Sequence, residues 1–282
     1  MNVLPEGTEA LIDRALAEDL GSGDHTTLAT IPADARGAAR LVVKDHGILA
    51  GLELAQAIAK RHDPALTLKP YMHDGAAVKP GEIAFTLMGP QRSILIVERL
   101  MLNFMQRMSG IATQTRQYVD AVQGTACRVL DTRKTTPGLR LIEKWAVRIG
   151  GGENHRMGLY DMVMIKDNHA DFVGGIPQAI RAAQAYLAER EMALPIEVET
   201  RNLKEVDAVL ATGGVQRIML DNFEPELLRT AVVRIGHRCE TEASGGIVLD
   251  NIRAYAETGV DFISVGALTH SVRSLDMSLK AI

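Results

Sequence analysis

The chain has 282 residues, of which 46% are hydrophobic, and 31 Lys and Arg stand against 35 Asp and Glu. A chain of this length can bury a large core in one domain or in two. The net charge of -4 gives no general attraction to nucleic acid or to an anionic membrane surface. No apolar run approaches the roughly 18 residues that cross a bilayer, and no signal-like segment opens the sequence. We therefore expect a cytoplasmic protein that binds neither nucleic acid nor membrane.

The first part of the chain predicts a small α/β domain over residues 1–112. Apolar residues at helical spacing indicate a helix over residues 9–20, ended by glycine, with a surface loop over 23–27. Short strands and turns follow over 38–95, with a helix near 52–61. A wide apolar stripe then predicts a long helix over 96–108.

From Arg128 onward, short apolar runs alternate with helical segments. The runs are Arg128–Arg133, Met162–Lys166, Pro195–Thr200, Arg217–Asn222, Glu240–Ser244 and Phe262–Val265. Strands separated by helices of this length pair in parallel through right-handed crossovers. Because most of these runs end in polar or charged residues, which a barrel gathers at its C-terminal face, we predict an α/β barrel over 113–270. The tail, 271–282, is a candidate to return to the first domain.

The cations of the segment 128–166 indicate a site for a polyanionic small molecule. This segment holds eight Lys and Arg against four acids, although the whole chain is acidic. Arginine forks suit carboxylates, and lysines add point charge. We expect Arg133, Lys134, Arg156 and Lys166, which lie at strand ends or in glycine-rich sequence, to contact the ligand. Arg140, Lys144 and Arg148 fall on a predicted helix and are interpreted as solvated charges.

Further groups converge on the same predicted edge of the barrel. The glycine run 150–152 lets the backbone approach a ligand and presents His155 from a loop. Glu199 and Asp221 end consecutive strands and would bind Mg²⁺ or stabilise a carbocation-like centre. Ser244, Gly245, Gly246 and Gly266 each follow a further strand and precede a predicted helix, so their backbone N–H groups suit a phosphate group. The two cysteines, Cys127 and Cys239, have no metal-ligand spacing and are expected to be reduced and buried.

Several motifs together resemble the quinolinate phosphoribosyltransferase family. They are Asp131-Thr132-Arg133-Lys134-Thr135-Thr136-Pro137-Gly138, Gly150-Gly151-Gly152-Glu153-Asn154-His155-Arg156-Met157-Gly158, Ile165-Lys166-Asp167-Asn168-His169, Met219-Leu220-Asp221-Asn222 and Glu242-Ala243-Ser244-Gly245-Gly246. The resemblance runs in order from about residue 11 to residue 279. It implies an N-terminal α/β sandwich domain, an open α/β barrel, and assembly at least as a homodimer, with a hexamer left open.

The resemblance also implies the reaction and the role of each site residue. Family members convert quinolinate and phosphoribosyl pyrophosphate, with Mg²⁺, to nicotinate mononucleotide, pyrophosphate and CO2. Arg133, His155, Arg156 and Lys166 match the quinolinate-binding residues, and Arg99 matches an arginine supplied by the neighbouring subunit. The matches to the phosphoribosyl pyrophosphate, metal and phosphate residues are Lys134, Glu199, Asp221, Ser244, Gly245, Gly246 and Gly266.

Two other interpretations compete with this one. A different phosphoribosyltransferase, or a paralogue linked to molybdenum transport that shares much of the pattern, would act on another anionic aromatic substrate. The complete set of Arg99, Arg133, His155, Arg156 and Lys166 suits two adjacent carboxylates better than one. A barrel that only binds a phosphorylated metabolite is the non-enzymatic alternative. Paired carboxylates beside the anion argue against it.

Overall fold

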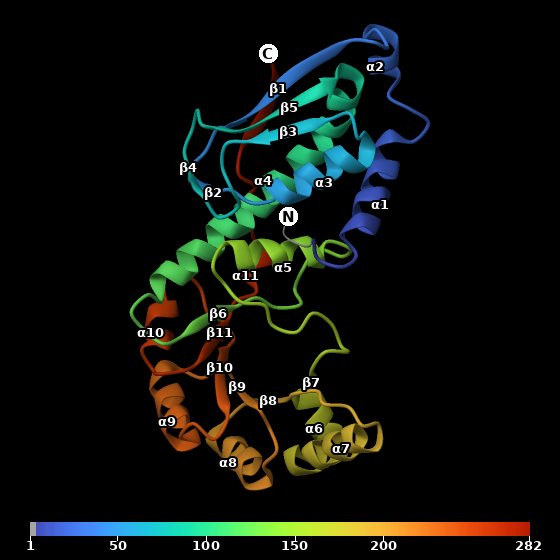
Figure 1. The fold of residues 1–282 in the computed structure, drawn as a ribbon. Coiled ribbons are helices and arrows are strands. Elements are labelled where there is room, and N and C mark those ends of the chain that lie inside the picture. The colour runs from blue at the N-terminus through green and yellow to red at the C-terminus, as the bar shows by residue number, and fades with distance from the viewer. Residues whose placement is uncertain (1–3) are drawn as a thin grey trace. The chain divides into compact units, whose positions relative to one another are not determined.

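The computed structural model describes residues 4–282 and divides into two compact units, so residues 1–3 of the predicted first domain lie outside the described residues. The first unit comprises the chain up to residue 116 together with 136–151 and 271–282, and the second comprises 117–135 and 152–270. The units are drawn in Figure 1.

A four-stranded antiparallel sheet forms the centre of the first unit. Its strands follow the order β12 (Met277–Ala281), β1 (Arg36–Val43), β5 (Ile83–Pro90) and β3 (Thr67–Pro70). A second sheet pairs β2 (Gly47–Ile48) with β4 (Ala77–Val78). Because β12 lies antiparallel to β1, with Leu279 opposite Leu41, the C-terminal tail returns to this unit.

Helices complete the first unit: α1 (Thr8–Leu20), α2 (His25–Thr30), α3 (Leu52–His62), most of α4 (Gln91–Ala121), and α5 (Arg140–Ile149). The predicted loop over 23–27 is largely helical, because the Asp24 carboxylate accepts the backbone N–H of Thr27 at 3.0 Å and caps α2. Helix α3 begins after Gly51, and the distant Asp74 carboxylate accepts the N–H of Leu52 at 2.9 Å. Helix α4 is longer than the stripe at 96–108 predicted.

Helix α5 belongs to the first unit. The chain therefore does not divide once, after residue 112, as the sequence predicted. The buried Glu143 lies 2.6 Å from Arg107 of α4, and Gly150 lies so close to Ala112 that a Cβ at residue 150 would collide with its carbonyl oxygen. Short-range sequence patterns do not reveal such a contact. The interpretation of Lys144 as a solvated charge was wrong, because its side chain is fully buried on α5.

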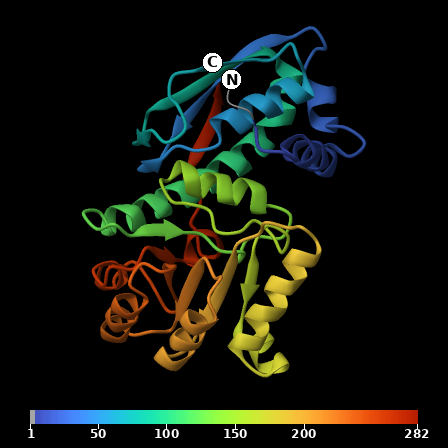
Figure 2. The same cartoon turned by 60° about the horizontal axis from the view of Figure 1, so that its bottom comes forward.

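The second unit is an open α/β barrel, as predicted. Six parallel strands follow the order β6 (Arg128–Leu130), β11 (Phe262–Ser264), β10 (Glu240–Ser244), β9 (Arg217–Asp221), β8 (Ile196–Thr200) and β7 (Val163–Ile165). Its helices are α6 (Asp167–Val173), α7 (Ile176–Glu189), α8 (Leu203–Thr212), α9 (Pro225–Ile235), α10 (Ile252–Ala256) and α11 (Ala267–His270). Helices α7, α8 and α9 cover the outer face of the strands (Figure 2).

The barrel is open between β6 and β7, and the opening has a local cause. Strand β7 follows β6 in the chain, but the helix between them, α5, belongs to the first unit. The segment after α5 instead runs beside β6, where Glu153 bridges to Leu130 and its carbonyl accepts the N–H of Asp131 at 3.1 Å. The loop carrying His155 therefore lies at the open edge.

Two further predictions concern single features of the chain. No helix within residues 4–282 is both long enough and apolar enough to cross a membrane. Both cysteines are free, as expected, and burial raises the pKa of the Cys127 thiol to about 12. Cys239 is only partly buried, so the expectation of a buried thiol holds for one of the two.

Candidate active site

A cavity of about 500 Å³ lies at the carboxyl ends of the barrel strands in the second unit. Alternation along parallel strands directs every second side chain inward. The lining residues are Thr132, Arg133, Lys134, His155, Arg156, Met164, Lys166, Glu199, Met219, Asp221, Glu242, Ser244 and Ser264. Eight predicted residues are among them, from Arg133 to Ser244. The barrel thus brings together groups that are more than 100 positions apart in sequence.

Two guanidinium groups face the cavity from different segments. Arg133 follows β6, and Arg156 stands on the loop beside that strand, where its Nη1 donates to the carbonyl of Met162 at 3.3 Å. Burial and then the positive charge of Arg133 lower the pKa of Arg156. Like charges held this close favour binding of an anion with two charged groups.

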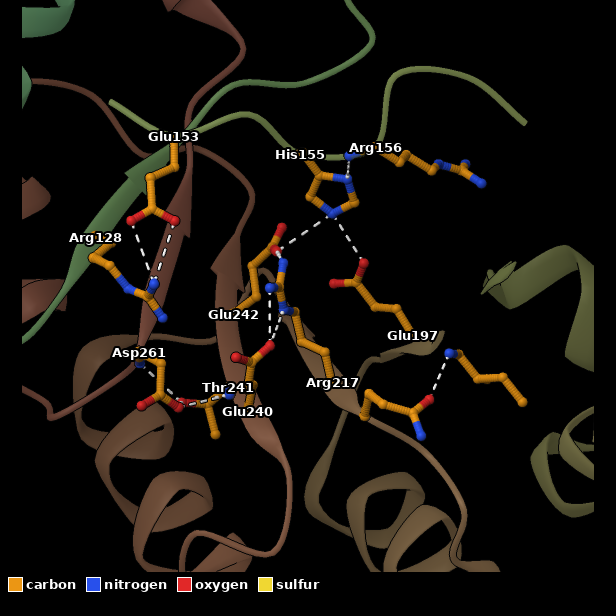
Figure 3. Close-up of polar contacts among 12 residues, drawn as sticks. Arg128, Glu153, His155, Arg156, Glu197, Arg217, Glu240, Thr241, Glu242 and Asp261 are labelled. Carbon is orange, nitrogen blue, oxygen red and sulfur yellow. Dashed lines mark hydrogen bonds and ion pairs between the residues drawn. The ribbon is translucent and has the colours of Figure 1, made fainter. Parts of the chain in front are cut away.

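His155 is fixed at its backbone and at both ring nitrogens (Figure 3). Its N–H donates to the buried carboxylate of Asp131 at 2.8 Å, and its Nδ1 accepts the N–H of Arg156 at 2.7 Å. Nε2 lies 2.9 Å from Glu197 Oε2 and 3.4 Å from Glu242 Oε2. Since Nδ1 is an acceptor, the ring hydrogen is on Nε2, directed toward the two carboxylates.

The charges around His155 are coupled. Burial lowers its pKa and the carboxylates of Glu197 and Glu242 raise it, with a net rise to about 9. Burial and the neighbouring Glu242 raise the pKa of Glu197 to about 7. A second proton on the ring would break the Nδ1 hydrogen bond from Arg156. We therefore keep the imidazole neutral, with its one hydrogen on Nε2. Arg217, 3.1 Å from Glu242, offsets the charge of that carboxylate.

Among residues 4–282, His155, Glu197 and Glu242 form the one group of three ligand side chains close enough to hold a metal ion together. Two observations argue against that use. Nε2 carries the hydrogen that a metal would have to replace, and the Arg217 guanidinium already contacts Glu242. The group is therefore an internal polar network of the barrel.

A second pair of carboxylates lies at the cavity itself, at the ends of β8 and β9. Glu199 Oε2 is 3.1 Å from the ammonium of Lys166. Burial and then the negative charge of Glu199 raise the pKa of Asp221, against hydrogen bonds from Ser244 and Asn222. Two carboxylates that destabilise each other's charge suit a divalent cation, which would remove this repulsion.

The glycine positions also bear on the cavity, although none of them is among its lining residues. Gly245 has φ +93°, and a Cβ there would collide with the amide of Asn222. A Cβ on Gly266 would lie 3.0 Å from Lys134 Cδ. The loop after β10 runs through residues 245–251 before α10 begins, so Gly245 and Gly246 do not directly precede a helix as predicted.

Arg99 lies apart from this group. It is an exposed residue of α4 in the first unit, where it lines a different cavity with Asp19, Asp24 and His25. The lining of the second unit's cavity includes no residue of the first unit.

Glu197, Glu242 and Arg217 had no role predicted from the sequence. Their signal was the strand period of two: Glu197 lies two positions before Glu199, and Glu242 two positions before Ser244. Residues so spaced face the same side of a strand, so the predicted lining positions implied acidic residues one layer deeper.

The fold and the cavity define an α/β-barrel protein that gathers arginine, lysine, histidine and acidic side chains at the carboxyl ends of its strands. Two family models match the chain: the C-terminal domain of quinolinate phosphoribosyl transferase over residues 111–280, and its N-terminal domain over residues 24–109. The chain belongs to the quinolinate phosphoribosyltransferase family, as the motifs indicated.

Named relatives and solved structures agree with this assignment. The chain is 48% identical to the chloroplastic nicotinate-nucleotide pyrophosphorylase (carboxylating) of Oryza sativa, over 96% of this chain and 77% of that protein. It is 45% identical to the corresponding Mycobacterium leprae protein, over 95% of each chain. The structure of NadC from Streptococcus pyogenes superimposes with a TM-score of 0.93 at 38% identity, covering 100% of this chain and 99% of that one.

Proposed function

We propose that this chain is a carboxylating nicotinate-nucleotide pyrophosphorylase, which converts quinolinate and phosphoribosyl pyrophosphate to nicotinate mononucleotide, pyrophosphate and CO2. The names of relatives at 45% and 48% identity over nearly the whole chain support this reaction. The observation that carries the proposal is the convergence of arginines, lysines, a histidine and two carboxylates on one cavity of the barrel.

The cationic side of the cavity suits quinolinate. This ligand carries two adjacent carboxylates on a pyridine ring, and Arg133 and Arg156 provide two forks for them. Lys166 adds charge, while its contact with Glu199 limits its freedom. His155, whose Nε2 contacts the buried carboxylates of Glu197 and Glu242, also lines the cavity and would lie beside the pyridine ring. These groups would orient the pyridine nitrogen toward C1 of the ribose.

Phosphoribosyl pyrophosphate would occupy the opposite side, beside Lys134, Ser244 and the glycines 245, 246 and 266. The hydroxyl of Thr269 donates to the carbonyl of Lys134 at 2.9 Å, which fixes the loop on which the ammonium stands. Gly266 leaves room for the Lys134 side chain. Small residues at these positions allow phosphate oxygens to approach the backbone closely.

The reaction requires positioning and charge stabilisation more than a protein nucleophile. As the bond from ribose C1 to pyrophosphate breaks, positive charge develops on the sugar, and the carboxylates of Glu199 and Asp221 stabilise it. The electron pair of the pyridine nitrogen then forms the new bond to C1. The resulting cationic nitrogen stabilises the electron pair left on the adjacent ring carbon when its carboxylate leaves as CO2, and that carbon then takes up a proton from water.

We also propose that Mg²⁺ takes part. Glu199 and Asp221 would hold it with water and pyrophosphate oxygens, because both carboxylates line the cavity at the ends of the paired strands β8 and β9. When bound, the ion would neutralise negative charge on the departing pyrophosphate. Lys134 would assist from the protein side.

A homodimer with shared sites is the proposed assembly, with a hexamer left open. Arg99 does not line the barrel cavity, whereas the family resemblance places an arginine of the neighbouring subunit at the substrate. Subunits carrying Arg99→Ala or Lys134→Ala should be inactive alone. After exchange, about half of the dimers are mixed and each has one intact site, so activity should recover to roughly a quarter of wild type. Absence of recovery despite demonstrated exchange contradicts sharing.

An assay for CO2 and nicotinate mononucleotide from quinolinate and phosphoribosyl pyrophosphate tests the function. Product formed only from both substrates supports it. Turnover of a monocarboxylate instead of quinolinate, with no CO2 released, would favour the molybdenum-linked paralogue. Cytoplasmic location stays a prediction of the sequence.

A further inference from the structure

The buried network beneath His155 has no part in the reaction described above, although it contacts a residue of the site. We propose that Glu197 and Glu242 are positioning residues that fix the imidazole of His155, and with it the backbone leading to Arg156, for binding of the dianionic substrate. This inference rests on the proposed function, because it assigns a purpose to the same cavity.

The contacts form a continuous chain from the barrel interior to the cavity (Figure 3). Nε2 of His155 lies between the carboxylates of Glu197 and Glu242, 2.9 Å and 3.4 Å away. On the other side of the ring, Nδ1 accepts the backbone N–H of Arg156 at 2.7 Å. A rotation of the ring would therefore break contacts at both nitrogens. Holding the ring also holds the peptide that carries the Arg156 side chain.

Glu197 does not itself line the substrate cavity at the carboxyl ends of the strands, and its side chain is fully buried. It lines a separate cavity with Arg217 and Met162, toward the amino ends of the strands. His155 is the side chain through which Glu197 connects to the substrate cavity.

Packing alone does not require a carboxylate at this position. Neither oxygen of Glu197 accepts a well-aligned hydrogen bond from the residues that the structure describes. Arg217 contacts Glu242 and Glu240. Apolar side chains of similar volume usually stabilise a protein interior at least as well as a buried charge. The contact with the His155 ring gives the carboxylate a specific purpose.

A Michaelis constant that changes for one substrate only would distinguish positioning from a structural role. Glu197→Leu removes the carboxylate at similar volume and leaves the buried Nε2 of His155 without its nearer partner, so we expect the quinolinate KM to rise about tenfold, the order of the cost of a buried polar group that loses its partner. The KM for phosphoribosyl pyrophosphate should stay within about twofold. Glu197→Gln retains an acceptor oxygen and should retain most of the quinolinate affinity.

The decisive comparison repeats the change in a His155→Ala background. If Glu197 acts through the ring, Glu197→Leu should then alter the quinolinate KM by less than about twofold. An equal rise in both backgrounds overturns the proposal. Asp261→Leu is the matched control, because Asp261 holds Thr241 in the barrel but does not touch His155. It should lower the melting temperature without changing the ratio of the two KM values.

A direct measurement on the wild-type protein keeps the proposal testable if the Glu197 variants do not fold. In ¹⁵N-histidine spectra at neutral pH, with the His155 signals identified from their loss in His155→Ala, Nε2 should be protonated and Nδ1 not. The opposite tautomer, or a ring protonated at both nitrogens, would overturn the proposal, because Nδ1 could not then accept the N–H of Arg156. Failure of the proposed function is a separate outcome, since wild-type protein would then release no CO2 from quinolinate.

Discussion

Replacing Gly245 by alanine tests how the loop after β10 supports the carboxylate of Asp221. Gly245 has φ +93°, and a Cβ there would lie 2.6 Å from Asn222 Cγ and 3.0 Å from Asn222 N, with its amide oxygen closer still. That same amide donates to Asp221 Oδ2 at 2.7 Å, and the Asn222 backbone N–H donates to the Ser244 carbonyl at 2.8 Å. The added methyl group must therefore displace the residue that orients Asp221.

Two separate costs can be assigned to Gly245→Ala. The left-handed backbone costs an alanine about 1–2 kcal/mol of folding free energy, which corresponds to a fall of several degrees in melting temperature for a chain of this size. Displacement of Asp221 acts on catalysis, where a shift of about 1 Å can lower the rate about 100-fold. We expect kcat/KM for phosphoribosyl pyrophosphate to fall by that order.

Gly174→Ala separates the two effects. Gly174 ends α6 with φ +91°, and a Cβ there would have nothing within 4 Å. It should lose similar stability in a thermal scan and retain its activity in the CO2 assay. Asn222→Gly removes the amide without adding a methyl group and should reproduce the loss of activity. If Gly245→Ala loses no more kcat/KM than Gly174→Ala, Asn222 does not position Asp221.

The other predictions concern binding, the metal and pH. Arg133→Ala should weaken quinolinate binding by about 2–5 kcal/mol and phosphoribosyl pyrophosphate binding far less, whereas the exposed Arg148→Ala should change neither; equal losses for both ligands in calorimetry would contradict the assignment. Activity should require Mg²⁺ or Mn²⁺, and Glu199→Gln or Asp221→Asn should lower turnover with quinolinate affinity nearly unchanged; full activity in excess chelator would refute this. Burial raises the pKa of Asp74, so its folded-state carboxyl binds a proton more readily and stability is lost as pH rises from the ordinary aspartate range. In urea titrations, the free energy of unfolding of Asp74→Asn relative to that of wild type should therefore be higher at pH 7 than at pH 4. An equal difference at the two pH values would exclude this cost.

The strands of the barrel could be predicted because each is a short apolar run that polar residues or glycines bound. All six predicted runs, from Arg128–Arg133 to Phe262–Val265, contain the observed strands β6 to β11. The residues at their ends, such as Glu199 and Asp221, follow directly, because parallel strands bring their carboxyl ends to one edge.

What the sequence did not reveal depends on contacts between distant segments. The placement of α5 in the first unit depends on Arg107 meeting Glu143, 36 positions later. The start of α2 was missed because the composition of this segment is typical of a loop, whereas the N-cap at Asp24 stabilises a helix there. The capping of α3 by Asp74 likewise joins residues 22 positions apart. None of these contacts has a periodic signal.

The arrangement of charge in the barrel follows from its layers. At the cavity, Glu199 and Asp221 stand where a cation or a developing positive charge can meet them, and Lys166 partly offsets the first. One strand position deeper, Glu197 and Glu242 contact the ring of His155, and Glu242 also contacts the guanidinium of Arg217. Of these four carboxylates, Glu199, Asp221 and Glu242 line the cavity, whereas Glu197 does not and contacts only the protein's own groups. Because Glu197 and Glu199 lie one strand period apart on β8, a shift of the strand register would be needed to bring Glu197 to the position of Glu199.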